Sequence, residues 1–301
     1  MSLTSRIVSG HTFSKIVKQT NFCSQLLDAF NAKVTVPGGF PYEAYNSKAF
    51  IQPWSILKMV EYSRTATFSN INFIDCGKLY EKYFVFIASS ASQILPELYD
   101  PSIKKSPLDL HIKLDYIGNT AFKTKTTISI QGSGILLCEN DTQSVCVLQE
   151  TRKPTPLPDW WKEKYSAANG KPMKFARLNV PENVAFTEQR LQVQASEVDP
   201  YMHINWSNFV KYCSDAFVLS QLQKDPDNTA GNMFRNVKNV SASYIKEANL
   251  GDFITVRFWQ DAVNIDLYNF QVLKDLDLLC ECCIEYYPVQ LSGAERFRSS
   301  L

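Results

Sequence analysis

Three side chains that can take part in hydrolytic chemistry fall within seven residues of one another. Asp199, His203 and Asn205 lie in the stretch EVDPYMHINWSNF, directly before a segment with helical periodicity. A carboxylate can attack a carbonyl or activate water, and a neighbouring imidazole or amide can orient the reacting groups. A helix that begins near Trp206 would point free backbone N–H groups and its positive dipole end at this loop. The pattern predicts a polar site at the start of this helix, where a carboxylate, an imidazole and free backbone N–H groups come together.

Each of these residues also has a structural interpretation. Asp199 precedes Pro200, a pair that commonly starts a turn, and Asn205 has the side chain of a helix N-cap. Glu247 closes a predicted strand, where solvated turn residues are common. For Asp199, Asn205 and Glu247 both interpretations remain open. His203 is one of only three histidines in the chain, and we interpret it as functional.

The element expected to position the cluster is a helix from about residue 207 to 222. Phe209, Cys213, Ala216 and Phe217 share one mostly apolar face of this segment. Four predicted strands follow, with turn signals between them: VSASYIKEA, DFITVRFWQDA, LYNFQVLKD and LLCECCIEYYPV. Antiparallel strands packed around one helix bury the apolar faces of both, so the sequence predicts an α+β fold.

The same order of elements occurs twice along the chain. PWSILKMVEYSR aligns with NWSNFVKYCSDA without gaps, which places Trp54 on Trp206 at an offset of 206 − 54 = 152. DYIGNTAFKTKTTI aligns with SYIKEANLGDFITV, which places Tyr116 on Tyr244 at an offset of 244 − 116 = 128. We therefore predict a duplicated domain whose first copy has 152 − 128 = 24 extra residues between helix and strand.

A proline-rich stretch separates the two copies. Three alternating prolines in RKPTPLPDWWKEKYSAANGKP prevent a sustained hydrophobic period, and Trp160 and Trp161 are expected to pack on the body of the protein. The expected parts are an N-terminal extension (1–30), a first domain (31–151), a linker (152–178) and a second domain (179–301).

The residues around the cluster resemble the hotdog-fold thioesterases, specifically the double-hotdog acyl-ACP and acyl-CoA thioesterase group. Members carry a D-x-N-x-H-V-N-N segment before a helix and a Y-x-x-E strand end. The matching residues are Asp199, His203, Ile204 and Asn205, then Asp215 and Ala216, then Tyr244 and Glu247. At the level of architecture the resemblance runs from about Val34 to Tyr287. It implies two tandem hotdog domains, each an antiparallel sheet wrapped around a long central helix.

This resemblance implies a hydrolase of fatty-acyl thioesters, with acyl-CoA or an acyl carrier protein thioester as substrate. It implies one active site, in the second domain, and neither cofactor nor metal. The implied catalytic residues are Asp199, His203, Asn205 and Glu247, and the implied substrate-binding residues are Tyr201, Trp206, Phe50 and Trp54. The chain departs from the plant acyl-ACP enzymes at Tyr201, where they carry the catalytic asparagine, and at Trp206 and Ala248.

The first domain shows no catalyst at the aligned positions. Ser47, Ala49, Ile51 and Pro53 align with Asp199, Tyr201, His203 and Asn205. We expect this domain to shape the acyl pocket, with Phe50, Ile51, Trp54 and Leu57 lining or supporting it. Glu61 lies on the first helix, and some hotdog thioesterases carry a helix glutamate. Arg64 follows three residues later, so we interpret Glu61 as one half of an intrahelical ion pair.

Two other functions are compatible with the same shell. A non-catalytic acyl-binding or scaffolding protein could result from the loss of the family asparagine at Tyr201. A hydratase or dehydratase is disfavoured because the histidine–phenylalanine–proline run and glycine motif of those enzymes are not found around His203. The duplicated domain already contains the pairing that single-hotdog proteins obtain by dimerising, so either a monomer or a homodimer is compatible with it.

Composition limits the class of partner and the compartment. The 301 residues include 31 basic and 30 acidic side chains, so no overall field draws the chain to nucleic acid. No apolar run approaches the roughly 20 residues that span a bilayer. We expect a cytoplasmic protein, with a mitochondrial location as the alternative because residues 1 to 27 carry basic but no acidic side chains.

Eight cysteines could form disulfides, bind metal or pack in the core. The clustered ones lie in LLCECCIEYY, whose strict alternation places Cys280 and Cys283 on opposite strand faces. Two ligands on opposite faces cannot converge on one zinc ion. We therefore predict reduced, mostly buried thiols.

Overall fold

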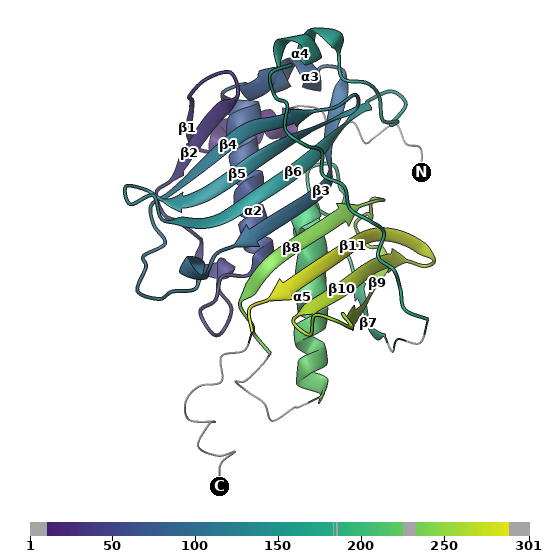
Figure 1. The fold of residues 1–301 in the computed structure, drawn as a ribbon. Helices are drawn as coiled ribbons and strands as arrows, with labels where there is room; N and C mark the ends of the chain where they lie inside the picture. The colour runs from purple at the N-terminus through teal and green to yellow at the C-terminus, as the bar shows by residue number, and fades with distance from the viewer. Residues whose placement is uncertain (1–10, 183, 185, 225–232, 289–301) are drawn as a thin grey trace.

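The computed structural model describes residues 11–182, 184, 186–224 and 233–288. They form one antiparallel sheet with the strand order β1-β2-β4-β5-β6-β3-β8-β11-β10-β9-β7, and two long helices lie on one face of it (Figure 1). The strands are β1 (Cys23–Leu26), β2 (Asn31–Val36), β3 (Tyr83–Ile94), β4 (Leu108–Ile117), β5 (Ala121–Ile130), β6 (Leu136–Leu148), β7 (Thr187–Gln192), β8 (Val237–Tyr244), β9 (Phe253–Gln260), β10 (Leu267–Lys274) and β11 (Asp277–Tyr286). The α-helices are α1 (His11–Gln19), α2 (Pro53–Arg64), α3 (Cys76–Tyr80), α4 (Asp159–Lys164) and α5 (Trp206–Lys224).

The sheet divides into two halves of the same plan. Strands β1 to β6 curve around α2, and strands β7 to β11 curve around α5 (Figure 1). The halves meet where β3 pairs antiparallel with β8, from Ser89 opposite Ser243 to Gln93 opposite Asn239. Helices α2 and α5 also contact each other behind this junction. The expected α+β fold, with a sheet wrapped around a long helix in each half, is confirmed.

Strand alternation explains how each sheet face is used. In β11, Cys280, Cys282 and Ile284 are at most 1% exposed and belong to the core under the sheet. Glu281 points to the opposite face yet is also buried, because the linker covers it. The backbone N–H of Leu178 and the side chain of Gln271 donate to its carboxylate at 3.3 and 3.0 Å.

The linker is anchored at several points on its course from α4 across the outer face of the sheet (Figure 1). Trp161 is fully buried, and its indole N–H donates to the carbonyl of Ile74 at 2.7 Å. Trp160 packs partly buried against the same core, so the expectation that both tryptophans pack on the protein is confirmed. Further along, the backbone N–H of Met173 donates to Gln143 at 2.9 Å.

The strand part of the predicted repeat was wrong. Tyr116 lies in β4, whereas Tyr244 ends β8, and the strand that takes the place of β8 in the first half is β3. Helices α2 and α5 begin 206 − 53 = 153 residues apart, and β3 and β8 begin 237 − 83 = 154 residues apart. The first half therefore has no 24-residue insertion between helix and strand. The error arose because a Tyr-Ile pair stands at the end of β4 and another, Tyr244-Ile245, starts at the last residue of β8.

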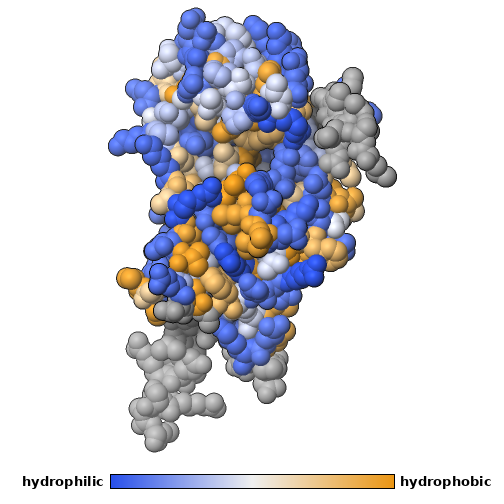
Figure 2. Space-filling model, turned by 90° about the vertical axis from the view of Figure 1, so that its right-hand side faces the viewer, coloured by the Kyte–Doolittle hydropathy of each residue, from blue (hydrophilic) through white to orange (hydrophobic). Residues whose placement is uncertain are grey.

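The surface and the thiols complete the description of the fold. Figure 2 shows hydrophobic side chains gathered near the middle of one face, with a largely hydrophilic region above them.

All eight cysteines are free thiols, and only Cys23 is exposed, which confirms the prediction of reduced and mostly buried cysteines. Among the described residues, no three His, Cys, Asp or Glu side chains are grouped to hold a metal ion. None of the helices in the described part of the chain is both long and apolar enough to cross a membrane.

Candidate active site

The loop before α5 folds tightly around the carboxylate of Asp199. One carboxylate oxygen accepts hydrogen bonds from the backbone N–H groups of Tyr201 and His203, at 2.8 and 3.4 Å. The backbone N–H of Asp199 donates to the carbonyl of His203 at 2.8 Å, and Met202 takes a left-handed conformation with φ = 65°. Asp199 therefore has the turn-forming role that its sequence position also allowed.

Its environment gives the same carboxyl an unusual proton affinity. Burial raises the pKa of Asp199 to about 6 from an ordinary 3.8, although the two backbone hydrogen bonds and His203 oppose the shift. The nearby carboxylate of Glu61 adds to the rise in this pKa. A carboxylate with a pKa near 6 is ionised at neutral pH and is a stronger base than an ordinary one.

His203 is held by a carboxylate from a different segment. Its Nδ1 lies 3.3 Å from Oε2 of Glu247, and its backbone forms an antiparallel bridge with Asn249. The carboxylate favours a proton on Nδ1, which leaves Nε2 to exchange a proton with a substrate. Burial by itself raises the pKa of Glu247. The hydrogen bond with His203 and the charge of Arg152 outweigh burial and hold that pKa below its usual range.

Arg152, at the start of the linker just after β6, completes this chain of contacts. Its Nη2 lies 2.9 Å from both carboxylate oxygens of Glu247, and its guanidinium lies 5.7 Å from the ring centroids of Phe84 and Phe86. Both charged side chains are more than 40% exposed, so solvent screens the pair and its contribution is orientation rather than stability. Arg152 could not be identified from the sequence, because 95 residues separate it from Glu247.

Tyr201 also contacts the N-terminal half. Its ring packs edge-on against Phe84 and Phe86, with centroid distances of 5.5 and 5.9 Å. Burial, with the charges of Asp199 and Glu61, raises the pKa of its phenol to about 12. The phenol is therefore protonated at neutral pH and keeps an O–H group that can donate a hydrogen bond.

Trp206 links the first turn of α5 to helix α2. Its indole N–H donates to Oε2 of Glu61 at 2.9 Å, and the same oxygen lies 3.8 Å from Nε of Arg64. The expected intrahelical pair between Glu61 and Arg64 is present, but the expectation was incomplete because Glu61 also binds across the helix interface. The cluster is thus built from both halves of the chain.

Asn205 acts as the N-cap of α5. Its side-chain oxygen accepts from the backbone N–H and the hydroxyl of Ser207, at 3.1 and 2.6 Å. Its backbone N–H donates to the carbonyl of Glu197 at 3.0 Å. These contacts fix the start of the helix, and they favour the capping interpretation of Asn205 over direct contact with a substrate carbonyl.

Glu197 anchors the loop from below and was not identified from the sequence. Its buried carboxylate accepts from the backbone N–H of Gln194 and from Lys211, both at 2.8 Å, and from the hydroxyl of Tyr212. Burial opposes ionisation, but these donors hold the pKa of Glu197 below its usual range. Its carbonyl binds Asn205 and, at 2.7 Å, the side chain of Asn208.

Phe50 and Trp54 lie in the equivalent region of the first half. Phe50 packs edge-on against Tyr99 at 6.0 Å, and the indole N–H of Trp54 is buried without a hydrogen-bond partner among the described residues. Within the described part of the chain, neither side chain forms a hydrogen bond or a ring contact with a residue of the Asp199 cluster. Their assignment to substrate binding stays a prediction.

The first-half counterpart of the loop is displaced by one residue from the predicted alignment. Asn46 accepts from the backbone N–H groups of Lys48 and Phe50, at 3.0 and 3.1 Å, as Asp199 does from its own loop. This match requires an offset of 153. The counterparts of Asp199, Tyr201, His203 and Asn205 are therefore Asn46, Lys48, Phe50 and Gln52, and not Ser47, Ala49, Ile51 and Pro53. The shared tryptophans at 54 and 206 caused the error.

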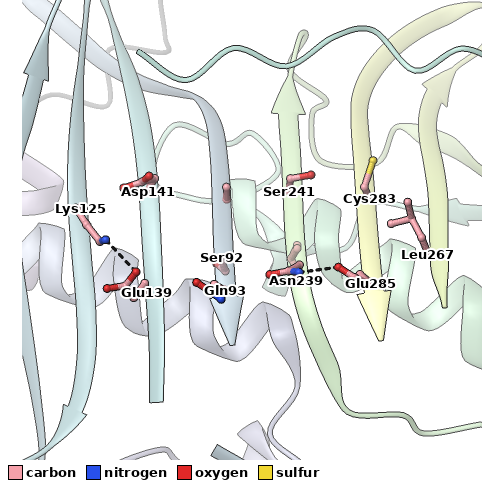
Figure 3. Close-up of a pocket in the computed structure, with 12 residues that line it drawn as sticks. Ser92, Gln93, Lys125, Glu139, Asp141, Asn239, Ser241, Leu267, Cys283 and Glu285 are labelled. Atoms are coloured by element: carbon pink, nitrogen blue, oxygen red, sulfur yellow. Dashed lines mark hydrogen bonds and ion pairs between the residues drawn. The ribbon is translucent and has the colours of Figure 1, made fainter. Parts of the chain in front are cut away.

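Two grooves differ in their relation to the cluster. Glu247 lines a solvent-open groove of about 400 Å³ together with Lys246 and Lys274, so the cluster has a side that faces water. A groove of about 460 Å³ lies on the outer face of the sheet across the β3–β8 junction (Figure 3). Its carboxylates are neutralised, as in the pair of Lys125 and Glu139 at 2.9 Å, and it is lined by none of the cluster residues.

Comparisons with known proteins identify the architecture. No family model and no curated protein sequence matches this chain. An acyl-ACP thioesterase from Bacteroides thetaiotaomicron has a similar structure, with a TM-score of 0.63 and 14% identity over 85% of this chain and 98% of that one. A 12:0-ACP thioesterase from Umbellularia californica gives a TM-score of 0.64 and 11% identity over 88% and 99% of the two chains. The chain therefore has the fold of the hotdog thioesterases over most of its length.

Proposed function

We propose that this protein hydrolyses fatty-acyl thioesters, carried by coenzyme A or by acyl carrier protein, at a single site in its C-terminal half. The observation that carries the proposal is the carboxyl of Asp199, whose pKa is raised to about 6, beside the His203–Glu247 pair at the start of α5. Thioester hydrolysis requires a base or nucleophile, a proton donor and stabilisation of an oxyanion, and this cluster supplies all three.

Each group has a role that follows from its surroundings. Asp199 activates a water molecule or attacks the carbonyl carbon, since its carboxylate has a raised pKa. Nε2 of His203, whose Nδ1–H is held by Glu247, accepts the proton that the attacking water loses and passes it to the departing thiolate. The positive end of the α5 dipole and the neutral phenol of Tyr201 stabilise the developing oxyanion.

The N-terminal half supplies one wall of this site. Phe84 and Phe86 pack against Tyr201, Arg152 binds Glu247, and Glu61 binds the indole of Trp206. These contacts lie within one chain, so a monomer is sufficient for the proposed activity. Light scattering coupled to size-exclusion chromatography distinguishes this from a homodimer.

Thiol release from acyl substrates tests the proposal. Purified protein is expected to release free thiol from medium- or long-chain acyl-CoA or acyl-ACP, and Asp199→Asn is expected to abolish most of this activity. A protein with a folded circular dichroism spectrum that turns over neither carrier at any chain length would contradict it.

A non-catalytic acyl-binding function is the second candidate. The observation that favours it is Tyr201, which occupies the position of the asparagine in the related motif and is packed against two phenylalanines. Native mass spectrometry separates the two functions. Retention of one intact acyl thioester per chain without turnover supports binding alone.

A further inference from the structure

The two halves bury very different side chains between helix and sheet. In the C-terminal half, Phe217 of α5 packs on Tyr268 and Tyr286 with centroid distances of 4.7 and 5.0 Å, and Phe270 packs on Phe258 at 5.1 Å. This interior is aromatic and apolar. Strand pairing identifies what stands at the same places in the N-terminal half, where α2 lies behind the strands (Figure 1).

The equivalent positions in the N-terminal half are polar. In the N-terminal half, Thr126 of β5 pairs with Asn140 of β6. In the C-terminal half, Phe270 of β10 pairs with Cys282 of β11, so Phe270 takes the place of Thr126. In the same register, Tyr268 takes the place of Thr124. Ser144 faces Ile87 of β3, as Tyr286 faces Val237 of β8. The offset of 153 between the helices places Arg64 on Phe217. The polar interior is therefore defined by Arg64, Thr124, Thr126 and Ser144, which replace Phe217, Tyr268, Phe270 and Tyr286.

These four side chains are almost completely buried. Arg64 is 5% exposed, and the two threonines and Ser144 are at most 1% exposed. The guanidinium of Arg64 donates to the hydroxyl of Ser144 at 3.1 Å and lies 4.8 Å from the ring centroid of Phe68. Burying a cation in this way costs free energy that an apolar side chain would avoid.

Several polar atoms of this interior have no partner within the described chain. They are Nη1 of Arg64 and the hydroxyl oxygens of Thr124 and Thr126. An unsatisfied buried donor or acceptor destabilises the fold, so such atoms are rare in a core that serves only packing. The three atoms belong to α2 and β5 of the same half, and they can donate to, or exchange hydrogen bonds with, an oxygen atom that enters this interior.

The polar interior adjoins the candidate active site. Oε2 of Glu61 accepts from the indole of Trp206 at 2.9 Å and lies 3.8 Å from Nε of Arg64. One carboxylate thus contacts both the first turn of α5 and the guanidinium of the polar interior. A chain attached to a carbonyl at Asp199 would reach this interior past Glu61.

We propose that the polar interior receives the acyl chain of the substrate and selects chains that carry a hydroxyl or keto oxygen over plain alkyl chains. The inference rests on the proposed thioesterase function and names its substrate class. Arg64 donates to the oxygen of the chain, and Thr124 and Thr126 donate or accept. Thr124, Thr126 and Ser144 are smaller than the aromatic residues that take their places in the other half.

The test compares matched substrates in wild type and two isosteric variants. Hydroxyacyl-CoA, with the hydroxyl at several positions, competes with the unsubstituted acyl-CoA of equal length, and the ratio of kcat/KM values is measured. Wild type is expected to prefer the best hydroxyacyl chain by about tenfold or more, since buried polar groups left unpaired penalise the plain chain. Thr126→Val is expected to bring the ratio close to one. Thr127→Val is the matched control on the opposite face of β5 and is expected to leave the ratio unchanged.

Binding separates this inference from the proposed function. If no thioester is hydrolysed, the proposed function fails, and calorimetry with the same two ligands still tests the polar interior. Tighter binding of hydroxyacyl-CoA that Thr126→Val removes supports the inference. Equal affinity or equal kcat/KM for the two ligands in wild type, or a preference that Thr126→Val does not change, overturns it. Arg64→Met is a further variant of the polar interior that should also reduce the preference, with its fold checked by circular dichroism.

Discussion

The loop before α2 and the loop before α5 share their backbone and differ in their chemistry. The N–H of Asn46 donates to the carbonyl of Phe50 at 2.9 Å, as Asp199 does to His203 at 2.8 Å. Ala49 and Met202 have φ values of 59° and 65° at the same place in each turn. The turn requires a side-chain oxygen at its first position, and an amide supplies that oxygen as well as a carboxylate does.

The difference lies in what surrounds each turn. In the second loop the carboxylate of Asp199 is followed by an imidazole that is oriented by Glu247 and, behind it, by Arg152. In the first loop the position of His203 is taken by Phe50, which packs on Tyr99. The two loops therefore share one backbone conformation, which carries polar, reactive side chains before α5 and an apolar contact before α2. The comparison separates the residues that the turn requires from those that the proposed reaction requires.

The largest expected effect comes from making the second loop resemble the first at Asp199. Asp199→Asn should reduce kcat by about a hundredfold or more, because it removes the base, while the amide keeps the turn as Asn46 does. Rate assays and thermal unfolding measure the two properties separately. Asn46→Asp is the matched control, and neither its rate nor its substrate range should change.

Asp199→Asn should lower activity without lowering thermal stability at pH 8. The folded pKa of Asp199, about 6, lies above the ordinary 3.8, so its protonated form is favoured by folding. The stability it contributes is fully present below its unfolded pKa and is lost as the pH rises through about 6. At pH 8 the Asp199→Asn protein should therefore unfold at a temperature no lower than wild type. A marked loss of both stability and activity would show that the carboxylate is structural.

His203→Phe should have the next largest effect. It installs the first-half residue, and a reduction of kcat of about tenfold to a hundredfold is expected from the loss of proton transfer. Phenylalanine fits the equivalent turn at position 50, so the folded spectrum should persist. Unchanged turnover in this variant would exclude His203 from the reaction.

The sequence predicted much of the fold because periodic elements carry local signals. The α5 helix and strands β8 to β11 follow from apolar periodicity and turn residues. Strand β7 was missed, since TEQRLQ is a mostly polar edge strand that resembles a loop. The one-residue error between the loops arose from matching identical tryptophans. The two loops instead share hydrogen bonds from backbone N–H groups to a side-chain oxygen, and these are visible only in the structure.

The candidate site was predictable only where its residues are close in sequence. Asp199 and His203 belong to one short motif, and Glu247 belongs to a second. Glu61 comes from α2 and Arg152 from the start of the linker after β6, and both reach the cluster only through long-range packing. The burial that raises the pKa of Asp199 depends on the same packing, and a single sequence carries no local signal for it.

The pH dependence of kcat/KM tests the base directly. Because the pKa of Asp199 is about 6, activity should fall with acid and lose about fivefold between pH 6 and pH 5 as the carboxylate becomes protonated. Above pH 7, kcat/KM should reach a plateau until another group titrates. An acid limb centred near pH 4 would indicate an ordinary, solvated carboxylate.

The smallest effect is expected at Glu61, whose counterpart in α5 is Ser214. The charge of Glu61 contributes to the raised pKa of Asp199, so Glu61→Gln should lower that pKa and move the acid limb by less than one pH unit to lower pH. The plateau rate should change little, because the glutamine oxygen can still accept from the indole of Trp206. Full pH profiles of wild type and variant measure the shift. A collapse of the plateau, with Asp199→Asn still active, would instead place the catalytic carboxylate on α2 and leave the loop before α5 with the same purely structural role as the loop around Asn46.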